Sequence, residues 1–185
     1  MTDKPPRKLL CVTAHPDDGC FGFGGALMLA AEAGFETSVV CFTDGQAATN
    51  RGASTSPEEL GRMRRAEFAA SCSILAVTHY ELLDYQDGQL EFADFSETAA
   101  KLVERIRSYR PQIVLTFGSD GGMNTHADHT MVSAFTTAAF HWAARGLSVI
   151  SLRLRLVLAA FRPPPPLHFR EPLGRSAPSF SLADR

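Results

Sequence analysis

The sequence predicts an α/β protein, a Rossmann-like three-layer sandwich with a mainly parallel sheet. From residue 8 to about residue 144, short β-branched or apolar runs alternate with longer helical segments, which is typical of βαβ units. The chain has 185 residues, of which 45% are apolar and 21% are charged. This size and composition indicate one domain that can bury a core without disulfide or metal staples.

Four segments are short, apolar and bounded by turn residues, and they predict the strands KLLCVTA, ETSVVCFT, THYELL and QIVLTF. The intervening segments predict helices over residues 22–33, 57–75 and 95–109, with a last helix that starts near Thr125. Pro57 follows Ser56, which suits the first position of the second helix. The order of these elements predicts a sheet with helices on both faces.

The character of the chain changes after Gly146. The segment LSVISLRLRLVLAAF alternates leucine with arginine and predicts one more strand with a polar face. The segment that begins at Arg162 is rich in Pro, Ser and Arg and has no period, so we expect it to be extended or disordered. The predicted organisation is one domain over residues 1–161 and a Pro-rich tail over residues 162–185.

The composition argues against several classes of partner. The net charge is −2 and basic residues form no stripe, so we expect no binding to nucleic acid. No apolar stretch is long enough to span a membrane, and no apolar leader follows MTDKPPRK, so we expect a cytoplasmic protein. Four cysteines without CxxC spacing indicate reduced thiols that are mainly buried.

Charged and imidazole groups follow the first predicted strand in the segment AHPDD. Ligands of open parallel sheets bind beyond the carboxyl ends of the strands, where His15, Asp17 and Asp18 are expected to lie. Pro16 favours an extended backbone at His15, so we expect the strand to run through the histidine. The following turn lets His15 and Asp18 face one point, with Asp17 beside it.

A second polar loop, GSDGGMNTHADHT, follows the strand QIVLTF. Its His126 and His129 are three residues apart at a helix start, so both rings can point into the same crevice. One histidine and one carboxylate from the first loop, with one histidine from this loop, make three ligands and leave a position open for water. That pattern is typical of catalytic zinc.

Simpler roles remain open for some of these residues. Asp128 fits a capping box with Thr125, and either Asp17 or Asp18 could cap the helix that follows the first loop. A pair of such motifs at two strand ends is harder to explain by capping alone. The joint pattern therefore favours a metal site.

Four segments together resemble the LmbE-like (PIG-L) N-deacetylases: AHPDD with the Gly-Gly helix start after it, RRAEFAASCSILAV, LLDYQDGQL and RPQIVLTFGSDGGMNTHADH. The resemblance extends over residues 8–144. It implies a zinc-dependent hydrolase, with Fe²⁺ as an alternative metal, that removes acetyl from an N-acetylglucosamine-type amide. The implied partner is a small N-acetylated amino sugar, and a homo-oligomer is compatible with it.

The resemblance also implies roles for individual residues. It makes His15, Asp18 and His129 the metal ligands. Asp17 becomes the general base and His126 faces the amide oxygen. Asp128 is implied as the residue that orients His126. Weaker correspondences suggest three substrate-binding residues, which are Arg51, Asp87 and Asn124.

Three other functions are compatible with parts of the sequence. A dinucleotide-binding module would explain the glycines after the first strand and Asp44 after the second, but GCFGFGG does not fit GxGxxG. A non-haem iron oxygenase could use His15, Asp17 and His129, although that chemistry usually occurs on a barrel of short strands. A catalytically silent metal-binding relative is the third alternative.

Overall fold

The computed structural model describes residues 6–52, 54, 56–122, 125–145 and 155–159. In this part of the chain, five parallel strands form one sheet in the order β3-β2-β1-β4-β5. The strands are β1 (Arg7–Thr13), β2 (Phe35–Thr43), β3 (His79–Tyr85), β4 (Ile113–Phe117) and β5 (Arg155–Ala159). The helices are α1 (Asp18–Phe21), α2 (Gly24–Glu32), α3 (Pro57–Ile74), η1 (Leu90–Phe92), α4 (Phe95–Tyr109) and α5 (Ala127–Ala144).

The predicted α/β class is confirmed. The first four strands and the four longer helices lie where the sequence predicts them, with ends that differ by one or two residues. The segment after Gly146 does contain a strand, β5. Two short elements, α1 and η1, were not predicted, because three or four residues are too few to show a period. Asn124 and the proposed tail over residues 162–185 lie outside the described residues.

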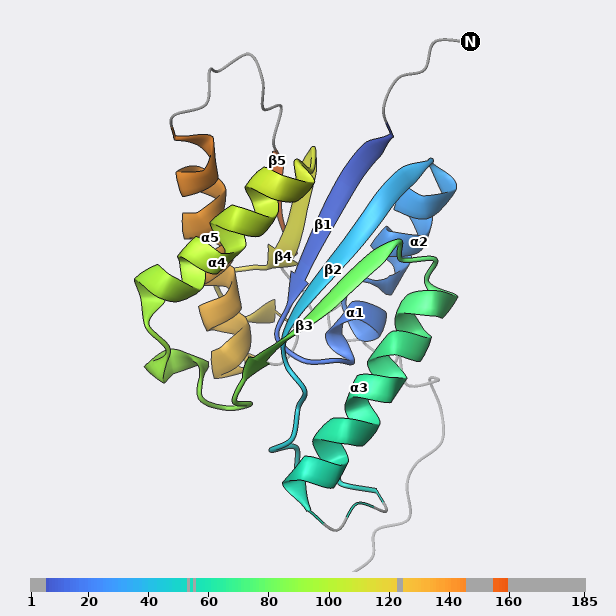
Figure 1. Ribbon diagram of the computed structural model, residues 1–185, viewed down its shortest axis with the longest axis vertical. Helices are drawn as coiled ribbons and strands as arrows, with labels where there is room; N and C mark the ends of the chain where they lie inside the picture. Colours follow the sequence, from blue (N-terminus) through green and yellow to red (C-terminus); the bar gives the residue numbers. More distant parts are fainter. Residues whose placement is uncertain (1–5, 53, 55, 123–124, 146–154, 160–185) are drawn as a thin grey trace, which may run out of the picture.

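The strand order reverses beside β1. The chain moves outward from β1 to β2 and β3, then returns across the sheet through α4 to β4 and β5. Right-handed crossovers place the helices of these two halves on opposite faces, and Figure 1 shows α1, α2 and α3 on one side with α4 and α5 on the other. Ligand sites of such sheets lie at the carboxyl ends of the strands where the order reverses, here β1 and β4.

Aromatic contacts join the layers around the central strands. The Phe42 ring on β2 stacks on Phe135 of α5, with centroids 5.9 Å apart. The Phe117 ring at the end of β4 meets Phe23, which precedes α2, at 5.2 Å. All four rings are at least nine-tenths buried, and burial of each contributes about 1.5–3 kcal/mol. The core therefore fixes the carboxyl ends of β2 and β4.

Helix starts follow side-chain caps that the sequence carries. The Ser56 hydroxyl accepts a hydrogen bond from the Glu59 amide at 3.2 Å and begins α3. The Asp94 carboxylate accepts from the Glu97 amide at 2.7 Å and begins α4. Each cap satisfies an amide that has no partner inside the helix. These caps explain why the two helices begin as predicted.

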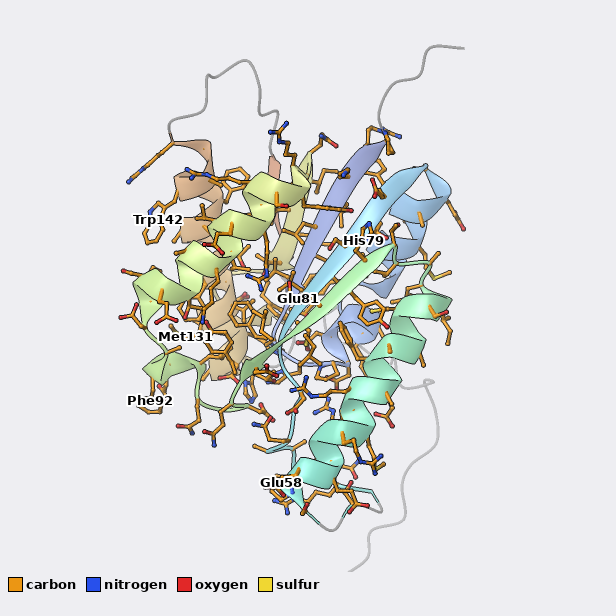
Figure 2. All side chains as sticks on the ribbon, in the orientation of Figure 1. Glu58, His79, Glu81, Phe92, Met131 and Trp142 are labelled. Atoms are coloured by element: carbon orange, nitrogen blue, oxygen red, sulfur yellow. The ribbon has the colours of Figure 1, made fainter. Side chains whose placement is uncertain are left out.

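The β3 side of the sheet carries exposed polar groups. Figure 2 shows His79 and Glu81 on β3. The His79 Nε2 lies 3.2 Å from a Glu36 carboxylate oxygen, in a pair whose histidine side chain is 60% exposed.

The four cysteines are free thiols, and three of them are buried, as predicted. In the described part of the chain, no helix combines the length and apolar character needed to cross a bilayer.

Candidate metal centre

The first loop folds back on itself through Asp18. Its Oδ2 accepts hydrogen bonds from the amides of His15 at 2.7 Å and Ala14 at 3.1 Å. β1 ends at Thr13, so His15 lies in this turn and not in the strand, contrary to the expectation from Pro16. The carboxylate binds the turn amides that would receive a pyrophosphate in a dinucleotide-binding fold. This contact argues against the dinucleotide reading.

Capping does not explain the carboxylates of this loop. Asp17 is the N-cap of α1, yet its side chain makes no capping hydrogen bond. Asp18 is the first residue of α1, and its carboxylate faces backward to the His15 amide. The longer helix α2 begins after Phe23, which also lacks a side-chain cap. Both aspartates are therefore available for other roles.

The second loop enters α5 through His126. His126, not Thr125, is the N-cap, and its Nδ1 accepts from the Asp128 amide at 3.2 Å. The predicted capping box with Thr125 is therefore not formed. His129 lies in the first turn of α5, where its ring stacks on Phe117 with centroids 4.1 Å apart. Its Nδ1 lies 2.9 Å from the Gly121 carbonyl oxygen, which favours Nδ1–H and leaves Nε2 as the free lone pair.

His15, Asp18 and His129 converge at the carboxyl ends of β1 and β4. The Nδ1 of His15 lies 3.1 Å from the Nε2 of His129. The Asp18 carboxylate approaches both rings, with Oδ1 3.2 Å from the His129 Nε2 and Oδ2 3.6 Å from the His15 Nδ1. The ligand atoms of the three residues lie within 4.8 Å of one another.

This donor set fits a divalent metal ion. Two ligand atoms about 2 Å from a tetrahedral zinc ion lie about 3.3 Å apart, close to the separations between these three side chains. His15 and His129 are 8% and 4% exposed, so bulk water competes little for their nitrogens. Two imidazoles and one carboxylate suit both zinc and ferrous iron. The site is a candidate metal centre in which three protein ligands leave a tetrahedral ion one further position.

A second group of carboxylates lies behind His15. Its Nε2 is 2.9 Å from Asp87 Oδ1 and 3.4 Å from Asp128 Oδ2. Among the described residues, this buried nitrogen makes no well-directed hydrogen bond, so the contacts are those of an ion pair. His126 lies edge-on to His15 with ring centroids 4.8 Å apart, and ligand atoms of His15, His126 and Asp128 also fall within 4.8 Å of one another.

Mutual charge stabilisation sets the protonation of this cluster without a metal. Burial by itself lowers the pKa of the His15 imidazole, but three surrounding carboxylates, led by Asp128 and Asp18, raise it to about 11. Burial raises the pKa of Asp18, whereas contacts with His129 and His15 hold it far below its usual range. Burial by itself raises the pKa of Asp87 and Asp128, but contacts with His15 outweigh it and lower the pKa of both carboxyl groups. Without a metal ion, the surrounding carboxylates therefore favour the protonated form of His15.

Asp17 lies outside this cluster, against a basic residue of α3. Its Oδ1 is 2.8 Å from Arg64 Nη2, and Arg64 Nη1 donates to the Gly45 carbonyl oxygen at 3.1 Å. A pocket of about 570 Å³ opens here, and its lining includes Asp17, Arg64 and Arg51. Sequence reasoning missed Arg64, because it lies in the basic run RMRR and no local pattern separates it from its neighbours.

The three predicted substrate-binding residues have different positions. Arg51 lines the pocket beside Asp17. Asp87 is buried and faces His15. Asn124 lies outside the described residues. The expected metal ligands and His126 thus form one cluster, whereas Asp17 lines the neighbouring pocket, and of the two described substrate-binding candidates Arg51 alone adjoins that pocket.

The fold and the site define a class of protein: a doubly wound α/β protein with a candidate catalytic metal centre where its strand order reverses. The family follows from the sequence, because the model of the GlcNAc-PI de-N-acetylase family (PIG-L) matches residues 10–140. The chain belongs to this family. The LmbE-like resemblance is thereby confirmed.

Individual relatives agree with the family match. A 1D-myo-inositol 2-acetamido-2-deoxy-alpha-D-glucopyranoside deacetylase of Salinispora arenicola is 32% identical, over 81% of this chain and 60% of its own length. The solved N,N'-diacetylchitobiose deacetylase of Pyrococcus horikoshii is 29% identical with a TM-score of 0.66, over 75% of this chain and 51% of its own. The 4-carboxy-2-hydroxymuconate hydratase GalB of Pseudomonas putida is 26% identical with a TM-score of 0.67, over 85% of this chain and 66% of its own. This chain thus spans about half to two thirds of these proteins.

Proposed function

We propose that the protein is a metal-dependent N-deacetylase that hydrolyses the acetamide of a small N-acetylglucosamine-type substrate. One observation carries the proposal: His15, Asp18 and His129 place their ligand atoms within 4.8 Å of one another at the carboxyl ends of β1 and β4. The named deacetylases among the relatives support the substrate class. Zinc is the proposed metal, with Fe²⁺ as the alternative. A cytoplasmic location stays a prediction.

The residues divide the chemistry of amide hydrolysis among them. A divalent ion held by His15, Asp18 and His129 would polarise the acetyl carbonyl and lower the pKa of a water molecule toward about 7. Asp17 would act as the general base that takes a proton from the attacking water, and Arg64 holds the Asp17 carboxylate at the pocket. His126 gives a proton to the departing nitrogen, which leaves poorly as an unprotonated amide anion.

Two alternatives have specific observations behind them. GalB shares the fold and covers most of this chain, so addition of water to an unsaturated carboxylate is the second candidate activity. The chain spans 60% of the length of its Salinispora relative, and the other alternative is a metal-binding relative without catalytic activity. Both alternatives keep the same candidate metal site. The first replaces amide hydrolysis by hydration, and the second has no catalytic activity.

The test is an assay for free amine with an N-acetylglucosamine glycoside, on protein purified without chelator and on protein stripped and reloaded with Zn²⁺ or Fe²⁺. We expect amine release that chelator abolishes and metal restores, and that Asp17→Asn removes. Hydration of an unsaturated dicarboxylate without amine release would favour the hydratase. Metal binding with neither activity would favour the silent relative and overturn the proposal.

A further inference from the structure

We infer that Asp87 is a positioning residue for His15. Its carboxylate contacts the Nε2 of the His15 ring, so that the Nδ1 faces the proposed metal ion. The inference rests on the proposed metal site and assigns Asp87 a role different from the sugar contact expected from sequence. His15 has two ring nitrogens with opposite surroundings. Nδ1 lies beside His129 and Asp18, whereas Nε2 lies beside Asp87 and Asp128.

Both oxygens of Asp87 are engaged inside the protein. Oδ1 lies 2.9 Å from the His15 Nε2, and Oδ2 accepts a hydrogen bond from the Ala47 amide at 3.1 Å. The side chain is 7% exposed. It is also absent from the lining of the pocket that holds Asp17 and Arg64. A buried carboxylate with both oxygens occupied is poorly suited to bind a sugar hydroxyl.

Asp128 fixes the loop that carries Asp87. Its Oδ2 accepts from the Gly88 amide at 2.7 Å, and its Oδ1 accepts from the Leu90 amide at 3.2 Å. Asp128 Oδ2 is farther from the His15 Nε2, at 3.4 Å, than Asp87 Oδ1 is. Of the two carboxylate oxygens beside Nε2, Asp87 Oδ1 is the closer, and among the described residues it accepts no backbone hydrogen bond, so the Asp87 contact is the one that faces the ring. Asp128 therefore braces the loop, and Asp87 takes the ring nitrogen.

This division determines which nitrogen of His15 is a ligand. A neutral imidazole carries one proton, so a carboxylate at Nε2 keeps the proton there and leaves the Nδ1 lone pair toward His129 and Asp18. Carboxylate partners of this kind typically change metal affinity by about 10–100-fold when they are removed. Loss of a sugar contact would instead raise KM and leave metal affinity unchanged.

The experiment compares Asp87→Ala and Asp87→Asn with the matched control Asp84→Ala. Asp84 lies on β3, three residues before Asp87, but its side chain is 88% exposed and pairs with Arg65. Zn²⁺ affinity is measured by competition with a chromophoric chelator, and the Co²⁺-loaded proteins are compared by visible absorption. Far-ultraviolet circular dichroism checks that each variant folds. kcat and KM are then measured for the N-acetylglucosamine glycoside.

We expect Asp87→Ala to weaken Zn²⁺ binding by about 10–100-fold and to alter the Co²⁺ spectrum. Asp87→Asn, whose amide oxygen can still accept from the ring, should lose less, and Asp84→Ala should bind as the unaltered protein does. Unchanged affinity and spectrum in a folded Asp87→Ala, with a raised KM, would overturn the inference in favour of a sugar contact. The metal titration needs no substrate, so an unaltered protein that binds metal without deacetylating would defeat the proposed function alone.

Discussion

Two histidine–carboxylate contacts in this protein differ in little but their surroundings. His15 and Asp87 approach to 2.9 Å at the carboxyl edge of the sheet, and His79 and Glu36 approach to 3.2 Å near the amino end of β3. The first pair is buried among further charged groups, whereas the His79 side chain is 60% exposed. Solvent screens the second pair and leaves the first unscreened. Burial and additional partners, and not the pairing itself, therefore distinguish the candidate metal centre from the exposed pair.

The largest expected effect is the removal of a metal ligand on the buried side. His129→Ala should strip most of the metal, because two ligands cannot hold the ion as three do, and turnover should fall below detection. Elemental analysis of the purified variant measures this directly. His79→Ala is the control on the exposed side and should keep full occupancy. Equal metal content in His129→Ala and His79→Ala would show that the buried histidine is not a metal ligand.

A strong effect on stability is expected at Asp128. Asp128→Ala removes the acceptor for the Gly88 and Leu90 amides and a countercharge of His15, which should cost about 3–5 kcal/mol of unfolding free energy. Urea denaturation of the metal-free proteins provides the measurement. A loss under about 1 kcal/mol would mean that the buried cluster behaves like a surface pair.

Asp17→Asn separates chemistry from metal binding. Asp17 is not part of the buried donor group and pairs with Arg64 instead. The variant should keep its metal and lose turnover by about a hundredfold or more, as expected for loss of a general base. Parallel metal analysis and amine release decide the matter. Loss of the metal together with activity would make Asp17 a ligand and restore the oxygenase-type triad.

A smaller effect is expected at Gly45, which positions Arg64. Its φ is +68°, and an added Cβ would meet the Arg64 guanidinium at 2.6 Å from its Cζ. Gly45→Ala should cost about 1–2 kcal/mol in backbone strain and displace Arg64 from Asp17. Thermal unfolding and kcat of the metal-loaded variant report the two effects. Normal kcat in a destabilised variant would show that the Arg64 contact is dispensable for turnover.

The smallest change should come from the exposed pair. Glu36→Gln removes the carboxylate that contacts His79 and Lys8, and unfolding free energy should change by less than about 1 kcal/mol. The same urea experiment that measures Asp128→Ala measures this variant. A loss as large as at Asp128 would show that exposure does not distinguish the two regions.

Local sequence patterns were sufficient to predict the strands, the longer helices and the residues of the candidate metal centre. Apolar runs bounded by turn residues predicted β1 and β4, and the two motifs AHPDD and HADH then brought His15 and His129 to neighbouring strand ends. This worked because the register of parallel strands makes their carboxyl ends meet at one edge. Family resemblance assigned the roles, which stay predictions.

Other parts of the site carry no local signal. The partner of Arg64 is Asp17, 47 positions earlier in the chain, and the contact depends on the turn at Gly45. The loop that carries Asp87 is held by Asp128, which accepts a hydrogen bond from the Gly88 amide. Asp128 and Gly88 are 40 positions apart in the chain. Such contacts arise from tertiary packing. One sequence alone could therefore single out Asp87 but not show that its carboxylate faces His15.

The placement of β4 beside β1 has a consequence for how the protein folds. His15 and His129 are 114 positions apart, and they meet only after the chain has passed through β2 and β3 and returned across the sheet. A folding intermediate that has docked β1, β2 and β3 alone holds half of the metal site. If the proposed ion binds the native state and not such an intermediate, metal in excess would stabilise the completed fold by mass action. Metal uptake during refolding would therefore mark the return of the chain from β3 through α4 to β4.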